Sequence, residues 1–454
     1  MPISRVASVD SLEPRTLFAA PLLIAESEGN NTRSRADSVV ISGVTNVTGT
    51  ATGKSDRDYF RFTASTDKTL DITVKKLSNR LVRATLTDAT GQVLASTDPA
   101  ASRNATSARL VPGKTYFLIT RTLDRTAGYT LNLRLIDPAI DVDGNRLERR
   151  NKATTLRGIN LGDVWLRRFR PDSDFDTLQQ DWKSNVVRLS VHPGNWQNQD
   201  RVQMLDALDR NITAATRRGL IVVIDWHAIG FPDGYFSPPR FANDGADFYD
   251  SSFPLSREFW QTISKRFGAN ERVVFDLWNA PVDPSDLTVR GSESKNLWPR
   301  FKPFYQTLLA DVRVNSSNVV IAAGNHWAYN LKGVRSNLLN DPLKNVAYAF
   351  QLYAGKDDNQ MTRWASALDR LNTVAPVIVT EWGYSTDPLA AFAKGTAADY
   401  GAKVTKFFES NRLSSIASYW QAVYETPLIE SDFVTPTTSG SFVKRYLASP
   451  GTFA

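Results

Sequence analysis

The chain has 454 residues, of which 42% are hydrophobic and 22% are charged, and its formal net charge is +7. This length is too great for one ordinary domain and allows two or three, each with its own hydrophobic core. The absence of cysteine excludes disulfide bonds, thiolate catalysis and zinc–thiolate sites. The basic residues are dispersed, which argues against a nucleic-acid partner, and no apolar run approaches the ~20 residues of a membrane span.

The first residues contain one apolar stretch, residues 17–25, which Pro21 interrupts. Acidic residues among the preceding arginines make it a marginal secretory signal, and a disordered tail is the alternative. The letters LEPR at residues 12–15 resemble a leader of planctomycete surface and exported proteins. We therefore interpret residues 1–28 as a leader or export segment and expect the protein to be extracellular or at the cell surface.

Residues 29–137 read as short alternating strands separated by turns. In LDITV (70–74) and YTLNLRL (129–135), every second residue is apolar or aromatic, which is typical of half-buried antiparallel strands. We expect an all-β sandwich. The segments EGNNT, VTGTATGKSDRDYFRFTAS, LTDATGQVLAS and LVPGKTYFLIT resemble the bacterial pre-peptidase C-terminal domain, an accessory module of secreted enzymes. Asp56 and Asp58 could bind calcium, but turn capping is the preferred interpretation because no further carboxylate completes an oxygen cage.

The segment DVDGNRLERRNK, which follows Pro138, begins like a calcium-binding EF-hand loop. Such a loop needs a Glu at its twelfth position, where this chain has Lys152, so the calcium interpretation fails. Asp143 and Gly144 instead predict a hairpin turn that opens the second domain, residues 138–454.

The second domain alternates short apolar runs with long amphipathic stretches. Helices are expected in stretches such as residues 200–219 and 298–313. Eight such βα units in ~300 residues predict a (β/α)8 TIM barrel, whose chemistry lies just beyond the C-terminal ends of its strands. The apolar runs are TLRGINL (155–161), VVRLSV (186–191), IVVID (221–225), VVFDL (273–277), VVIAA (319–323), VAYAF (346–350), VIVT (377–380) and IASYW (416–420).

Aromatic residues collect at the ends of these runs. Tryptophan faces at one rim would stack on sugar rings, although tryptophans can also simply cap the core. A three-histidine metal site is a weaker alternative because the histidines lack the close spacing that usually starts one; we expect no metal and no cofactor. The residues are His192, His227, His326, Trp165, Trp226, Trp278, Trp327, Trp382 and Trp420.

Polar residues occupy the same strand ends: Arg188, Asn279, Tyr353 and Glu381. A carboxylate directly behind four apolar residues is unfavourable unless Arg or Tyr partners hold it. Glu381 is therefore either one half of a structural ion pair with Arg188 or a nucleophile.

The motifs LRGINLGDVW, NVVRLSVH, VVIDWHAIG, VVFDLWNAPV, NVAYAFQLYAG, VIVTEWGYS and ASYW are similar, in order and spacing, to those of glycoside hydrolase family 5, which includes many cellulases. The resemblance implies a barrel that hydrolyses β-linked glycans with retention, using one Glu as nucleophile and another as acid/base. It assigns the nucleophile to Glu381. It implies substrate-binding or support roles for Arg188, His192, His227, Asn279, Gln351, Tyr353, Trp420, Trp165 and Trp382.

The chain departs from the family where the acid/base is expected, because Ala280 stands between Asn279 and Pro281. A methyl group cannot exchange a proton, so hydrolysis should be severely impaired. Gln351 stands where the family usually has His, and Asp276 often has Glu at its equivalent. Several departures in one site favour natural loss over an engineered knock-out.

Three functions remain open at this stage. In the first, the protein is secreted and monomeric and binds β-linked polysaccharide through a catalytically impaired barrel. In the second, it is an active glycosidase or transglycosylase that uses a different acid. In the third, it is a purely structural surface protein. Asp283 and Asp286 are the substitute acids nearest in sequence. The retained Glu381 and the aromatic residues argue against the structural option.

Overall fold

The structure is a computed structural model that describes residues 21–77, 80–101, 103–123, 125–232, 248–283, 295–390 and 392–449. The chain divides into two compact units. The first comprises residues up to Phe62, Asp71–Thr106 and Thr115–Leu135, and the second Thr63–Leu70, Ser107–Lys114 and the chain from Ile136 onward. Within the described ranges, none of the helices combines the length and the apolar character needed to span a membrane. The LEPR letters lie outside the described residues.

The first unit is rich in strands, which form two five-stranded sheets. The predicted alternation is confirmed in both quoted segments: Leu70, Ile72 and Val74 are buried, as are Leu131 and Leu133. One sheet has the order β1 (Leu22–Ala25), β3 (Val44–Ala51), β10 (Ala127–Ile136), β5 (Thr69–Lys76) and β8 (Ala105–Arg109). The other has the order β2 (Asp37–Ser38), β4 (Asp58–Thr63), β9 (Thr115–Thr122), β6 (Val82–Asp88) and β7 (Val93–Ser96).

Two local predictions about turns can be compared with the structure. Asp56 accepts hydrogen bonds from the backbone N–H and the hydroxyl of Thr52, at 2.6 and 2.8 Å, which confirms turn capping for this residue. Asp58 instead accepts a hydrogen bond from the Tyr129 hydroxyl at 2.6 Å. The predicted hairpin is confirmed, since β11 (Asp141–Asp143) and β12 (Arg146–Glu148) pair antiparallel around Gly144, and β13 (Ala153–Thr154) pairs with β12.

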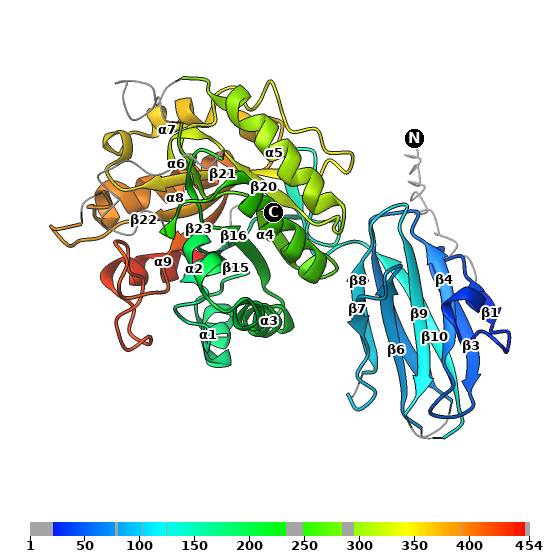
Figure 1. The fold of residues 1–454 in the computed structure, drawn as a ribbon. Coiled ribbons are helices and arrows are strands. Elements are labelled where there is room, and N and C mark those ends of the chain that lie inside the picture. The colour runs from blue at the N-terminus through cyan, green and yellow to red at the C-terminus, as the bar shows by residue number, and fades with distance from the viewer. Residues whose placement is uncertain are drawn as a thin grey trace, which may run out of the picture. The chain divides into compact units, whose positions relative to one another are not determined.

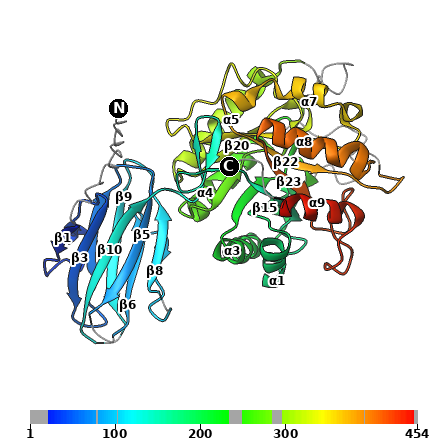
Figure 2. The same ribbon diagram turned by 180° about the vertical axis from the view of Figure 1, so that it is seen from behind.

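The second unit contains a closed barrel of eight parallel strands (Figures 1 and 2). Each predicted apolar run supplies one strand, and the runs are buried because the barrel interior and the surrounding helices cover both sides of the wall. In order around the barrel the strands are β14 (Arg157–Asp163), β15 (Val186–Val191), β16 (Ile221–Trp226), β18 (Val273–Asp276), β20 (Val320–Ala323), β21 (Val346–Tyr353), β22 (Val377–Gly383) and β23 (Ser414–Ser418).

Helices lie around the outside of the strands, as α3, α4, α5 and α8 show in Figures 1 and 2. Asp200 caps the first turn of α3, where its side chain accepts from the backbone N–H of Gln203 at 2.9 Å, as N-cap residues do. The helices are α1 (Asp172–Asp176), α2 (Pro193–Asn198), α3 (Arg201–Arg217), α4 (Phe253–Phe267), α5 (Trp298–Arg313), α6 (Asn325–Ala328), α7 (Met361–Leu368), α8 (Ala402–Asn411) and α9 (Thr438–Ala448).

Candidate active site

A fully buried arginine, Arg188 on β15, links three carboxylates inside the barrel. Its Nη1 donates to Glu381 Oε1 at 2.8 Å. Its Nε and Nη2 donate to Asp276 Oδ2 at 3.1 and 2.9 Å, and Nη2 lies 3.0 Å from Asp225 Oδ1. Burial disfavours the charged guanidinium, but the neighbouring carboxylates outweigh it and raise the pKa of Arg188. The guanidinium therefore remains charged and fixes the positions of the acidic groups around it.

Glu381, on β22, has both carboxylate oxygens held. Oε2 accepts from the Tyr353 hydroxyl at 2.6 Å, and Oε1, besides Arg188, lies 3.5 Å from Asn160 Nδ2. Desolvation and the charge of Glu381 raise the pKa of Tyr353 well above its ordinary value, so the phenol stays a donor. This arrangement holds an oriented carboxylate of the kind that nucleophilic attack requires. The ion pair between Glu381 and Arg188 is also what we expect if Glu381 has a purely structural role.

Asn279 connects Arg188, the ion-pair partner of Glu381, to a histidine–aspartate pair. Its Oδ1 accepts from Arg188 Nη2 at 2.9 Å and from Gln351 Nε2 at 2.8 Å. Its Nδ2 lies 3.5 Å from His227 Nε2, and His227 Nδ1 lies 2.5 Å from Asp225 Oδ2. Gln351, which stands where the family usually has His, thus holds the Asn279 side chain in place.

Ala280 lies beside this network on the short strand β19 (Ala280–Pro281) and is 3% exposed. Its backbone N–H donates to Ala228 O at 3.1 Å, and β19 pairs with β17 (Ile229–Gly230). The structure therefore places a methyl group on the strand that follows Asn279. Asp283, three residues further on, is buried and bonded to Arg300, with Nη1 to Oδ1 at 2.8 Å. The other substitute acid considered, Asp286, lies outside the described residues.

Two further polar residues, His192 and Asp163, lie at this end of the barrel. The ring of His192 packs against the ring of His227, with their centroids 4.5 Å apart, and burial lowers the pKa of His192 well below its ordinary value. Asp163 ends β14, accepts from the backbone N–H of Trp165 at 2.9 Å and also from Asn195. Burial raises the pKa of Asp163 to about 6, which is unusual for a carboxyl group and was not foreseen from the sequence.

The predicted rim of tryptophan faces is wrong in large part. Trp382 and Trp420 are 0% and 1% exposed. Trp382 makes edge contacts with Phe408 and Tyr446, and Trp420 with Trp182. Trp226 and Trp278 are also buried, whereas Trp165 and Trp327 are partly exposed. The core-capping alternative therefore holds for these four of the six, because their side chains are buried and do not form an open surface.

Tyr419, the neighbour of Trp420, takes part in the site instead. Burial, followed by the charges of Glu381 and Tyr353, raises the pKa of Tyr419 well above its ordinary value. Its ring also packs on Tyr424, at 4.7 Å between centroids. Together with Asn160 and Asp225, Tyr419 is a site residue that sequence reasoning missed, although both Asn160 and Asp225 stand in quoted strand motifs.

His326 lies apart from the other two histidines, since its ring contacts Trp327 and Tyr329. Among the residues that the structure describes, no group of three or more His, Asp or Glu side chains has the arrangement of a metal site.

The comparison with protein families matches residues 147–425 to the cellulases, glycosyl hydrolase family 5. The chain belongs to this family. The family 5 match covers the barrel and every site residue described above, so the resemblance of the strand motifs is confirmed. The matching segment does not include the first strand-rich unit.

Curated relatives of the family 5 domain include a cellulase of a Thermoanaerobacterium species, 23% identical over 287 residues, which are 61% of this chain and 68% of that protein. An endoglucanase of Thermobifida fusca is 25% identical over 258 residues, 54% of this chain and 48% of that protein. A β-glucanase of Saccharophagus degradans, solved with cellotetraose, has a TM-score of 0.60 at 23% identity, covering 68% of this chain and 92% of its own. That structural likeness supports the fold.

Proposed function

We propose that the protein is a secreted, monomeric β-1,4-glycan-binding member of family 5 whose hydrolytic activity is severely impaired. One contrast carries the proposal. Glu381 is held by Arg188 and Tyr353 at 2.8 and 2.6 Å, as a nucleophile requires, whereas Ala280 occupies the position at which the family has its acid/base.

The chemistry of retaining glycosidases explains why this contrast matters. Such enzymes use two carboxyl groups ~5 Å apart, one to attack the anomeric carbon and the other to protonate the departing oxygen. Proton transfer by a positioned acid contributes about 10² to 10⁴ in rate. Without it, an ordinary glycan alkoxide leaves very slowly, and a water molecule lacks the base that would complete turnover.

The ligand class follows from the family and from its named members. The relatives are named as a cellulase and an endoglucanase, and the solved β-glucanase holds cellotetraose. The polar groups that could bind such a glycan are His227 and Asn279, and neither depends on the missing acid. The buried Arg188 holds Asn279 and Glu381 in position. Binding can therefore survive the loss of catalysis.

Calorimetry with cello- and manno-oligosaccharides tests this function. We expect a binding heat with at least one series and no measurable release of shorter products during the titration. Asn279→Ala should weaken binding, whereas Asp432→Asn, at an exposed position that contributes no group to the site network, serves as the control. An absence of heat with every oligosaccharide contradicts the proposal.

The alternative of an active hydrolase now has a specific candidate acid. Burial raises the pKa of Asp163 to about 6, so this carboxyl group holds a proton closer to neutrality than an ordinary Asp does. Asp283, by contrast, is already paired with Arg300. If Asp163 were the acid, cello-oligosaccharides would be cleaved with an alkaline limb that Asp163→Asn removes and Asp283→Asn leaves unchanged. We expect no such cleavage.

For the first unit, we propose a β-sandwich of the pre-peptidase C-terminal type that accompanies the barrel outside the cell. The two five-stranded sheets and their alternating burial support this proposal. Fractionation of the producing cells, followed by detection of the full-length chain, tests the location: recovery only inside the cell contradicts it.

A further inference from the structure

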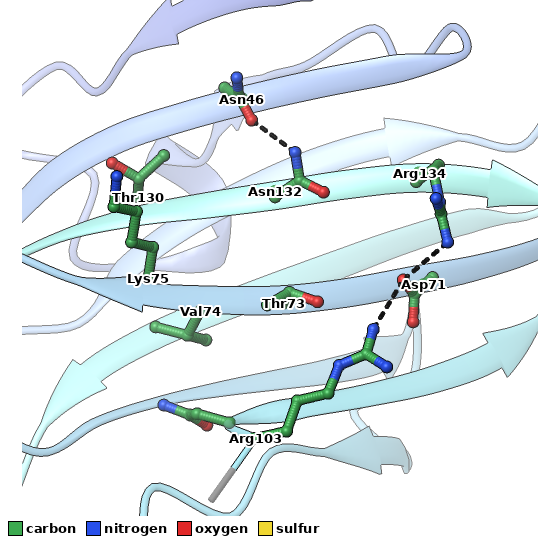
Figure 3. A pocket seen from close by; sticks show the side chains of 10 residues that line it. Asn46, Asp71, Thr73, Val74, Lys75, Arg103, Thr130, Asn132 and Arg134 are labelled. Carbon is green, nitrogen blue, oxygen red and sulfur yellow. Dashed lines mark hydrogen bonds and ion pairs between the residues drawn. The ribbon is translucent and has the colours of Figure 1, made fainter.

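The strand-rich unit has a polar groove on the outer face of one sheet (Figure 3). The groove has a volume of about 710 Å³ and is lined mainly by side chains of β3, β10 and β5 and of the residues just before β8. Because side chains alternate across a strand, the residues between the buried Leu131 and Leu133, and between Ile72 and Val74, point to this outer face. The groove lies within the first unit and is separate from the barrel site.

The groove carries a local excess of positive charge. Lys75, Arg103 and Arg134 contribute three cations and Asp71 contributes one carboxylate. Both arginines approach Asp71 Oδ2, at 3.5 Å for Arg103 and 3.7 Å for Arg134, and their side chains are 70% and 52% exposed. These separations are longer than normal hydrogen bonds, and exposed pairs of this kind are weak. The guanidinium N–H groups are therefore available to an anionic ligand.

One amide of the groove lining, Asn104, is buried and has a structural role. Asn104 lines the groove and is 6% exposed. Its Nδ2 donates to Val82 O at 2.8 Å, but among the described residues no donor satisfies its Oδ1. A buried acceptor without a partner is uncommon in folded proteins. Because Oδ1 is itself enclosed and Nδ2 is bonded to β6 of the other sheet, the Asn104 side chain anchors the residues before β8 and does not contact a ligand.

Two other amides, Asn46 and Asn132, supply hydrogen-bonding groups along the groove. Asn132 Nδ2 donates to Asn46 Oδ1 at 2.8 Å, as Figure 3 shows. Each amide carries one further polar group, and Thr73 and Thr130 add hydroxyls. None of the described residues that line the groove is aromatic, so the groove lacks the stacking surface used for neutral sugar faces or for the bases of single-stranded nucleic acids.

We propose that this groove binds a segment of an anionic polysaccharide, one that carries carboxylate or sulfate groups. The acidic groups pair with Arg103, Arg134 and Lys75. Sugar hydroxyls exchange hydrogen bonds with the side chains of Asn46, Asn132, Thr73 and Thr130. This ligand differs from the neutral glycan proposed for the barrel. Binding at the two sites can therefore be tested independently.

Calorimetry on the full chain tests the proposal with four probes: a galacturonate oligosaccharide, a sulfated dextran fragment, a neutral cello-oligosaccharide and a single-stranded oligonucleotide. The test variant is the double substitution Arg103→Ala/Arg134→Ala. The control is Arg57→Ala/Arg61→Ala, which removes the same charge at two exposed positions of the other sheet, one just before β4 and one within it. All four side chains are exposed, so we expect thermal unfolding to be unchanged.

We expect at least one acidic glycan to bind, with an affinity that falls as salt rises. The test variant should weaken binding about tenfold or more, as the loss of charge-assisted hydrogen bonds implies, and the control should change it less than about twofold. The probe that binds more tightly identifies the acidic group. Failure of both acidic glycans to bind, equal weakening in the two variants, or tighter binding of the oligonucleotide overturns the proposal.

Discussion

Replacing Ala280 with Glu should restore hydrolysis, because it returns a proton donor to a site in which the nucleophile is already held. The structure supplies the other requirements: Glu381 is bonded to Arg188 and Tyr353 at 2.8 and 2.6 Å, and Gln351 and Arg188 hold Asn279 beside the position to be changed.

The expected size of the gain follows from the role of the missing group. General acid/base catalysis contributes about 10² to 10⁴ in rate, which corresponds to about 2.7 to 5.4 kcal/mol of transition-state stabilisation. Because Ala280 is 3% exposed, a longer side chain has to displace its neighbours. We therefore expect a gain near the lower limit, about 10²-fold in kcat/KM.

The assay is the release of reducing ends from cellopentaose by folded, monodisperse protein. Ala280→Gln is the matched control, since it adds the same bulk without a transferable proton, and should stay at the background rate. Adding Glu381→Gln to the Ala280→Glu variant should abolish the gain. The reasoning is refuted if Ala280→Gln and Ala280→Glu are equally active, or if the folded Ala280→Glu variant shows no gain.

Two further predictions concern stability. Arg188→Met leaves Glu381, Asp276 and Asp225 without their shared cation, so the free energy of unfolding in urea should fall by about 3–5 kcal/mol; an unchanged value contradicts the buried network. The pKa of Asp163 is raised by burial from 3.8 to about 6, so the folded state holds this proton more tightly than the unfolded state. Stability should therefore decrease by about 2–3 kcal/mol as pH rises from about 4 to about 6, and Asp163→Asn should remove this decrease.

The barrel and the centre of its site could be predicted from the sequence because one physical rule governs both. Short apolar runs between amphipathic stretches become buried parallel strands, and the C-terminal ends of those strands meet at one end of the barrel. Tyr353 stands at such an end and Glu381 lies two residues before one. Arg188, predicted to end its strand, lies in the first half of β15, and its long side chain reaches Glu381. Their convergence follows from topology, although they are far apart in the chain.

The tryptophans were misplaced because position at a strand end does not determine which side of the barrel wall a side chain occupies. Successive side chains of a strand point to opposite faces. Since Glu381 points into the barrel, Trp382 must point outward, where it meets Phe408 and Tyr446. Trp226 likewise follows the inward Asp225. Alternation within each motif could have revealed this from the sequence.

Other site features depend on contacts that no motif specifies. The raised pKa of Asp163 results from its burial, which outweighs the hydrogen bonds from Trp165 and Asn195 that lower it. The role of Tyr419 in place of Trp420 depends on how the chain turns after β23. The groove of the first unit requires the pairing order of its sheet, which alternation alone does not give.

The central claim is that Glu381 remains a competent nucleophile in a site without an acid/base, and a leaving group that needs no proton tests it most directly. A dinitrophenyl cellobioside should release one equivalent of phenol and leave a cellobiosyl group on Glu381, detectable by mass spectrometry of the intact protein and absent in Glu381→Gln. Azide should then restore turnover and give a β-glycosyl azide. If neither the adduct nor the azide product forms, Glu381 is one half of a structural ion pair with Arg188 and the account is wrong.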